Sequence, residues 1–250
     1  MSERSSASEH KPFPETRRSV IGALGDPDSD RRRQAFETLI TVYWKPVYTY
    51  LRLFKRVERA AAEDLTQGFF AHAFEQRTLD GYDPARARFR TWLRRCLDGY
   101  VANQHKAAQR LKRGGAYAHL PLDFENAEGD LRHYDPPASE DLETFFQREW
   151  TRALFALAVD ELRRESLAGG RGLEFALFER YDLEAPQGDA QPTYAELARE
   201  FSISAGKVTN SLHAMRSRLR RKVLSRLRET CGSEAEYRAE ARTLFGHDPK

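Results

Sequence analysis

Basic and hydrogen-bonding side chains concentrate in two segments of this sequence, residues 86–113 and 193–228. Lysine and arginine attract phosphates, while hydroxyl, amide and imidazole groups exchange hydrogen bonds with base edges. From residue 207 to residue 228 the second segment carries a run of cations without an intervening acid: Lys207, Arg216, Arg218, Arg220, Arg221, Lys222, Arg226 and Arg228. These residue types in this density favour binding to nucleic acid.

Two helices are expected to position the second segment. Thr193 and Glu196 match a capping box at the start of a short helix, and Ser204 offers an N-cap for a longer one. Residues 193–224 are therefore predicted to form a helix-turn-helix. The apolar residues expected between its helices are Ala195, Leu197, Ala198, Ile203, Val208 and Leu212. The alternative is an ordinary helical hairpin with a solvated basic face.

The polar residues of this helix pair divide into two predicted groups. The base or phosphate contacts are expected at Ser204, Lys207, Thr209, Asn210 and His213, whereas Arg216, Arg218 and Arg220 are expected to anchor phosphates. A phosphate anchor contributes to the salt dependence of binding without reading sequence.

The first segment, residues 86–113, interleaves basic and aromatic residues. Aromatic faces stack on unpaired bases while cations follow the backbone, which is the combination used for single strands. The same aromatic spacing also fits a helix core, so the basic residues are the stronger candidates. The candidates are Arg88, Arg90, Trp92, Arg94, Arg95, Lys106 and Arg110.

Catalytic and metal-binding patterns are not found in the sequence. The histidines considered have neither ligand spacing nor a nucleophile partner, and no phosphate-binding glycine loop precedes a helix. Cys96 and Cys231 lie far apart and form no metal motif. We therefore expect a protein that is not an enzyme and that needs no cofactor or metal.

Composition sets the remaining limits. The formal net charge of the 250 residues is only +3, so the position of the charges matters more than their sum. No apolar run resembles a secretory signal or a membrane span, which predicts a cytoplasmic protein without a membrane span.

Helical periodicity predicts an all-α protein with two helical domains. Apolar residues recur at helical steps in residues 35–54, 60–74 and 88–101, and Pro46 is expected to kink or divide the first of these helices. The expected organisation is a disordered tail (residues 1–16), an N-terminal helical bundle (17–113), an extended acidic linker (114–141), a C-terminal helix-turn-helix domain (142–230) and a tail (231–250). That last tail is expected either to form a short helix covering the last domain or to dock a regulator.

The helix at residues 60–74 carries Glu63, Asp64 and Gln67 on its expected exposed side. Acids near a helix start are favourable against the helix dipole, which is a sufficient structural explanation. The functional alternative is docking of a partner.

Taken together, these segments resemble the extracytoplasmic-function (ECF) family of bacterial RNA polymerase sigma factors. The likeness covers roughly residues 17–228. Its matching strings are residues 43–48 (YWKPVY), 62–70 (AEDLTQGFF), 83–93 (DPARARFRTWL), 193–198 (TYAELA) and 204–208 (SAGKV).

The resemblance implies a role for each segment. Glu63, Asp64 and Gln67 would dock on the clamp helices of the largest subunit of the RNA polymerase core, and the 88–113 helix would handle the melted minus-ten strand. The residues listed above from Ser204 to Arg220 would contact the minus-thirty-five element of promoter DNA, and the linker would thread the polymerase cleft. An anti-sigma factor or a regulatory Ser/Thr kinase is left open as a further partner.

Three positions depart from the family pattern. Ala61 stands where many relatives carry an aspartate, and Gly99 and Asn103 replace residues often seen as Asn and Asp in the melting helix. Phosphorylation of Thr66 could restore charge near Ala61, although an unmodified helical threonine is the simpler interpretation. The alternative function is a stand-alone helix-turn-helix transcriptional regulator, which would leave Glu63, Asp64 and the 88–113 helix without a role.

Overall fold

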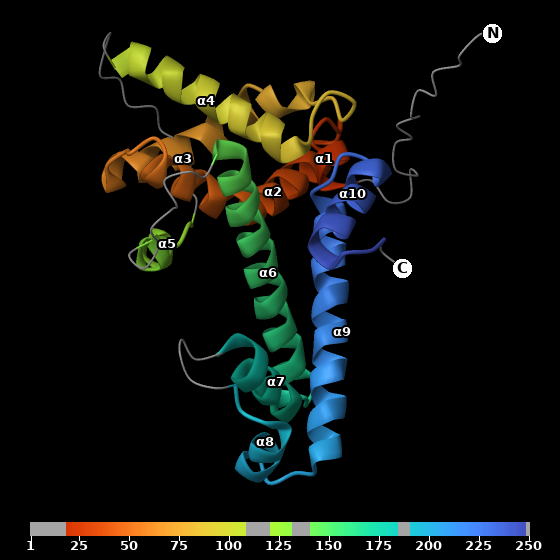
Figure 1. Cartoon of the computed structure of the whole chain (residues 1–250). Coiled ribbons are helices and arrows are strands. Elements are labelled where there is room, and N and C mark those ends of the chain that lie inside the picture. The colour runs from red at the N-terminus through yellow and green to blue at the C-terminus, as the bar shows by residue number, and fades with distance from the viewer. Residues whose placement is uncertain (1–18, 109–120, 132–140, 185–190, 249–250) are drawn as a thin grey trace, which may run out of the picture. The chain divides into compact units, whose positions relative to one another are not determined.

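The chain folds entirely as helices in a computed structural model that describes residues 19–108, 121–131, 141–184 and 191–248 (Figure 1). These ranges contain no β-strand, which confirms the all-α prediction. Within them, every helix is too short or too polar to cross a lipid bilayer. The predicted disordered tail, residues 1–16, lies outside the described residues.

The chain divides into two compact units whose boundaries differ from those expected. Unit 1 comprises residues 1–153 and 227–250, and unit 2 comprises residues 154–226. The C-terminal tail therefore belongs to the same unit as the N-terminal helices. The long helices α6 (Leu142–Ala168) and α9 (Ala205–Glu229) each contribute residues to both units.

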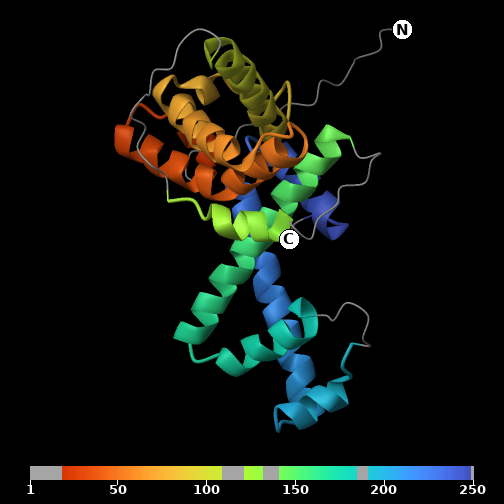
Figure 2. The same ribbon diagram turned by 90° about the vertical axis from the view of Figure 1, so that its left-hand side faces the viewer.

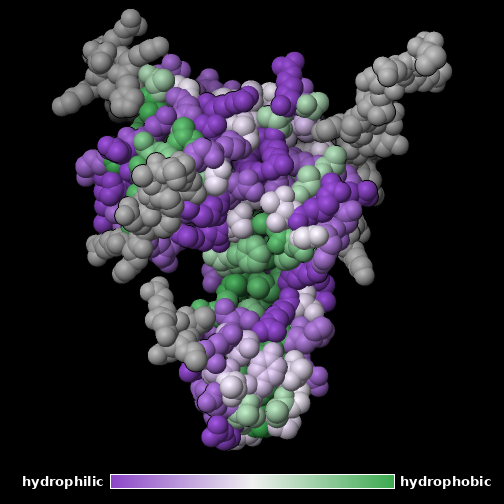
Figure 3. All heavy atoms as spheres, viewed as in Figure 1, coloured by the Kyte–Doolittle hydropathy of each residue, from purple (hydrophilic) through white to green (hydrophobic). Residues whose placement is uncertain are grey.

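Unit 1 is built around helix α2, whose buried side includes Leu39, Tyr43, Val47 and Leu51. Helices α2, α3 and α4 lie side by side in both ribbon views (Figure 2), and hydrophilic residues cover most of the visible face of the unit (Figure 3). The N-terminal elements are α1 (Val20–Ala23), α2 (Ser29–Leu53), α3 (Arg59–Glu75), a 3₁₀ turn η2 (Thr78–Gly81) and α4 (Phe89–Ala108).

Helix α2 continues through Pro46, so the proline does not divide it. Proline inside a helix removes one backbone hydrogen bond and costs about 3 kcal/mol. Pro46 is buried between Tyr43 and Val47, both of which belong to the core. Apolar burial along the helix offsets the local cost.

Part of the predicted extended linker is a helix, α5 (Phe124–Leu131). Asp123 caps it by accepting a hydrogen bond from the Asn126 amide. Phe124 packs against the Tyr48 ring of α2, and Glu128 accepts a hydrogen bond from the Tyr48 hydroxyl at 2.6 Å. Apolar contacts and the ion pairs of Arg52 with Glu128 and of Lys45 with Asp130 therefore hold this segment against α2 as a helix, not in the expected extended conformation. The rest of the linker, residues 114–120 and 132–140, lies outside the described residues.

The C-terminal tail contains helix α10 (Glu234–Phe245), which begins at an N-cap, Ser233. Tyr237, Glu240 and Ala241 of α10 are buried. The predicted covering helix is thus present, but it covers unit 1 rather than the helix-turn-helix.

Unit 2 assembles the helix-turn-helix on the C-terminal part of α6. A π-helical segment, η3, follows α7 directly. Besides parts of α6 and α9, its elements are α7 (Gly172–Phe178), η3 (Glu179–Leu183) and α8 (Tyr194–Glu200).

Candidate nucleic-acid interface

The helix-turn-helix begins as the sequence predicts. Thr193 and Glu196 form the reciprocal capping box of α8: the Thr193 Oγ1 accepts from the Glu196 amide at 3.2 Å, and the Glu196 carboxylate accepts from the Thr193 amide at 2.7 Å. The hydrogen bonds that the Glu196 carboxylate accepts from the Thr193 amide and hydroxyl lower the pKa of Glu196. Ser202 adopts a positive φ of 53° in the turn, and the Ser204 Oγ accepts from the Lys207 amide at the start of α9. Both predicted caps are therefore confirmed.

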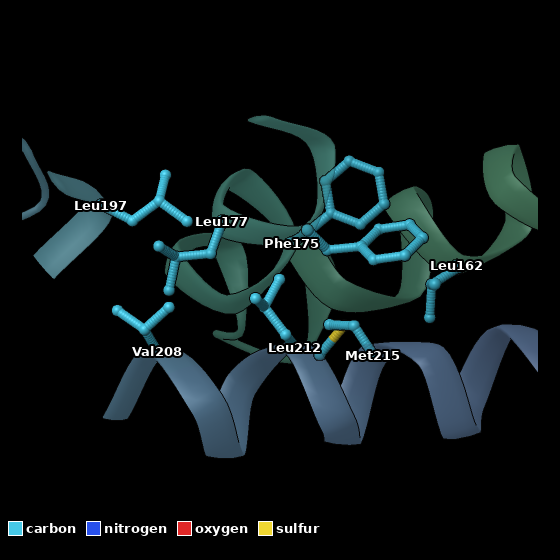
Figure 4. Packing of buried hydrophobic residues seen from close by; sticks show 8 residues of the cluster. Leu162, Phe175, Leu177, Leu197, Val208, Leu212 and Met215 are labelled. Atoms are coloured by element: carbon cyan, nitrogen blue, oxygen red, sulfur yellow. The ribbon is translucent and has the colours of Figure 1, made fainter. Parts of the chain in front are cut away.

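A compact apolar core joins α8 and α9 to α6 and α7 (Figure 4). Leu197, Val208 and Leu212 are fully buried, as expected. One detail differs, because Ala195 is exposed and does not join the core. Ser211 is also buried. The buried members are Leu162, Phe175, Leu177, Phe178, Leu197, Val208, Leu212 and Met215. This core fixes the face of α9 that points outward.

The outward face of α9 presents small and polar side chains. Positions three and four residues apart share one helix face, so Gly206, Asn210, His213 and Ser217 form a continuous stripe. We call these four residues the polar stripe. The first three are exposed and Ser217 is half-buried. Thr209, beside the stripe, is exposed, but its hydroxyl donates to the Ala205 carbonyl of the preceding turn.

Two cations flanking the polar stripe are held by acids from neighbouring segments. The Lys207 Nζ lies 2.9 Å from a carboxylate oxygen of Glu174, and Arg216 makes a bidentate pair with Asp182. The side chains of Lys207 and Arg216 remain 49% and 45% exposed. Exposed ion pairs contribute about 0–1 kcal/mol, so Lys207 can exchange its carboxylate for a phosphate at small cost. The bidentate pair of Arg216 is the stronger of the two.

Cations further along α9 serve a different purpose. Lys222 and Arg226 both contact Glu161 of α6, and Lys222 also contacts Glu165. The side chain of Lys222 is only 13% exposed. The predicted basic run is thus partly neutralised by acids distant in sequence, and its C-terminal part fastens α9 to α6. Arg218 and Arg220 are half-buried.

The basic segment of unit 1 is largely engaged within the protein. Arg90 is 3% exposed and pairs with Glu240, and its guanidinium carbon lies 5.1 Å from the centre of the Trp150 ring. Arg94 pairs with Asp98 and Glu143. In this arrangement, neither guanidinium faces solvent as a strand-binding role requires.

The other candidates of that segment are distributed over α4 and the turn before it. Arg88 is exposed and pairs with Glu240 at 2.9 Å, whereas Arg95 is exposed on α4. Trp92 is half-buried, and its indole nitrogen is buried without a hydrogen-bond partner. Arg110 and the side chain of Lys106 lie outside the described residues.

The acidic candidates for docking lie in the first half of α3. Asp64 is exposed, whereas Glu63 and Gln67 are half-buried. The Arg59 guanidinium joins Glu63 to Glu125 of α5, with a distance of 2.8 Å in each pair. The three side chains are near one another, but Glu63 already has a cationic partner.

The positions that depart from the family pattern have distinct environments. Ala61 and Gly99 are exposed, and Asn103 is exposed on α4. Thr66 is fully buried, and its hydroxyl donates to the Ala62 carbonyl at 2.7 Å. A kinase would not reach Thr66 without opening this part of unit 1.

Sequence reasoning missed two acids of α10, the half-buried Glu236 and the buried Glu240, which contact the start of α4. A signal was present, because Ser233 and Glu236 have the spacing of a helix start and the two acids stand four residues apart on one face.

The described residues contain no cluster of three or more His, Cys, Asp or Glu side chains that would hold a metal ion. Comparisons with protein-family models, curated proteins and solved structures found no match.

Proposed function

We propose that this chain binds the core enzyme of RNA polymerase and directs promoter recognition and transcription initiation, as ECF sigma factors do. The observation that carries the proposal is the polar stripe of α9, flanked by the exposed cations Lys207 and Arg216. A helix of this kind fits the major groove of duplex DNA, which is about 12 Å wide. Small residues allow close approach of the helix, and the described surroundings of Gly206 leave it open.

The polar stripe offers groups suited to reading bases. An asparagine amide makes two hydrogen bonds with adenine, and a lysine donates to guanine. Asn210 and His213 are therefore the proposed base contacts, with Lys207 contacting a base or a phosphate. Arg216, which must leave Asp182 to do so, is a proposed phosphate contact.

The step from DNA binding to promoter recognition rests on the resemblance of residues 43–93 to the family. Asp64 and its neighbours on α3 form an acidic surface for the polymerase clamp. For Glu63 to bind the clamp, its carboxylate must leave Arg59 and pair with a residue of the polymerase.

A stand-alone helix-turn-helix regulator is the second candidate. It is favoured by one observation, because Arg90 and Arg94 of unit 1 are engaged by acids while the polar stripe of unit 2 is exposed. Such a protein would bind duplex DNA in the absence of polymerase.

Selection from a random duplex pool, with and without bacterial core polymerase, separates the two functions. Our proposal predicts a shared motif only when core is present, and a motif enriched equally by the chain alone would favour the regulator. Anisotropy with the selected duplex then compares Asn210→Ala with Arg238→Ala, an exposed position on α10. Loss of a base contact costs about 1–3 kcal/mol of affinity, whereas the control should not change it.

A further inference from the structure

Helix α10 places two acids against the start of α4 within unit 1. Glu240 is 1% exposed, and one of its oxygens contacts the guanidinium groups of both Arg88 and Arg90. The other oxygen of Glu240 and the Nε of Arg90 are buried without hydrogen-bond partners. A buried charge pair with unused hydrogen-bonding groups is a poor source of stability.

Glu236 accepts hydrogen bonds from three further donors in the same region. Its carboxylate accepts from the Phe89 amide at 3.0 Å, the Gly232 amide at 2.8 Å and the Tyr82 hydroxyl at 3.2 Å. Phe89 is the first residue of α4, so its amide belongs to the positive end of that helix. Burial raises the pKa of Glu236 despite these donors.

The donors that hold the two carboxylates are of the type that binds phosphate. Two arginines and the Phe89 amide at a helix start match an anionic tetrahedral group as well as a carboxylate. The surface also has an approach from solvent, because a groove of about 290 Å³ lies between the 84–88 turn and α10. Arg86 and Arg88 line this groove, and the Arg86 side chain is 86% exposed.

We propose that α10 occupies a nucleic-acid-binding surface at the start of α4, and that phosphates of single-stranded DNA compete with Glu236 and Glu240 for it. A strand would meet Arg86 and Arg88 in the groove first. Its phosphates would then replace the carboxylates, so that Arg90 exchanges one anion for another and is never left buried without a partner. The inference rests on the proposed function for the identity of the ligand.

Two variants loosen α10 in different ways. Glu240→Gln removes the charge that holds both arginines. Gly232→Ala keeps every charge, but a Cβ there would overlap the Tyr82 ring and its hydroxyl, at 2.9 Å. Glu234→Gln is the matched control, since it removes the same charge from α10 but contacts Arg228 and Arg238, not α4.

The experiment measures binding of fluorescent oligo(dT) of about 20 nucleotides to the full chain without polymerase. Affinity scales with the fraction of molecules whose site is open, so a tenfold gain in that fraction gives about tenfold tighter binding. We expect such gains for Glu240→Gln and Gly232→Ala and none for Glu234→Gln. In the wild type, oligo(dT) should increase hydrogen exchange of residues 234–245.

Equal affinities for wild type, Glu240→Gln and Gly232→Ala would overturn the inference, as would absence of binding by all of them. Unchanged hydrogen exchange of α10 at saturating oligo(dT) would overturn it as well. In case a variant does not fold, this wild-type measurement decides the question. A failure of the proposed function is distinguishable, because it concerns duplex DNA and core polymerase, which this assay does not contain.

Discussion

The pairing of Arg90 with Glu240 gives a quantitative prediction for the stability of unit 1. Both side chains are at least 97% buried, with exposed fractions of 3% and 1%. Glu240→Gln removes one charge and leaves the other buried, a change that costs about 3–5 kcal/mol. For a folding unit of this size, the loss corresponds to a decrease in melting temperature of roughly 10 °C.

Tryptophan fluorescence during urea unfolding measures this effect selectively. All three tryptophans, Trp44, Trp92 and Trp150, belong to unit 1, and unit 2 has none. The fluorescence midpoint therefore reports unit 1 alone, and it should fall for Glu240→Gln while the unfolding of unit 2 is unchanged.

Two further variants test the electrostatic reasoning. Glu234→Gln, whose side chain is 31% exposed, should cost less than about 1 kcal/mol. Replacing both buried partners, in Arg90→Met with Glu240→Leu, should recover most of the stability that Glu240→Gln loses. If Glu240→Gln and Glu234→Gln instead shift the midpoint by the same small amount, the charge of Glu240 has no special role and the reasoning is refuted.

Three other predictions concern caps, glycines and pH. Thr193→Ala should destabilise unit 2 by about 1 kcal/mol in circular dichroism, and no loss would mean that the capping box is dispensable. Gly99→Ala, at an open helical site, should raise the free energy of unfolding by about 0.5–1 kcal/mol, whereas Gly68→Ala, whose Cβ would overlap the Tyr100 hydroxyl, should lower it by about 1–3 kcal/mol; equal effects in urea unfolding would contradict the packing. Burial raises the pKa of Glu236 above its ordinary value of 4.5. The protonated side chain therefore contributes its full stabilisation below this ordinary value, and the stabilisation is lost as the pH rises through the raised pKa. The stability of wild type relative to Glu236→Gln should therefore fall from pH 4 to pH 7, and a difference that rises over this range would contradict the sign.

Local signals in the sequence predicted several helix positions well. The start of α8 is set by hydrogen bonds between residues three apart, Thr193 and Glu196, so the pattern is complete in the sequence. Both ends of α3 and the start of α4 also agree with the periodicity within one residue, because a single apolar face determines them, whereas α4 continues to Ala108, beyond the periodic run that ends at residue 101. Pro46 was expected to kink or divide its helix, and the division is wrong, since the stabilising contacts come from other segments.

The functional surfaces were harder to predict because charge pairing is a tertiary property. The run from Lys207 to Arg228 contains no acid, yet Glu161, Glu174 and Asp182 meet it in space. The engagement of Arg90 by α10 was missed for the same reason, since its partner stands 150 positions away along the chain. Periodicity identifies which face of a helix is buried, but it does not identify what covers that face.

The most direct test of the proposed function is transcription in vitro by bacterial core polymerase from a template carrying the selected duplex motif. The account predicts that adding the chain yields a transcript from one discrete start. The combined change of Lys207→Ala and Asn210→Ala should abolish that transcript, whereas Arg238→Ala should leave it unchanged. A chain that neither binds core polymerase nor produces a discrete transcript would contradict the central claim.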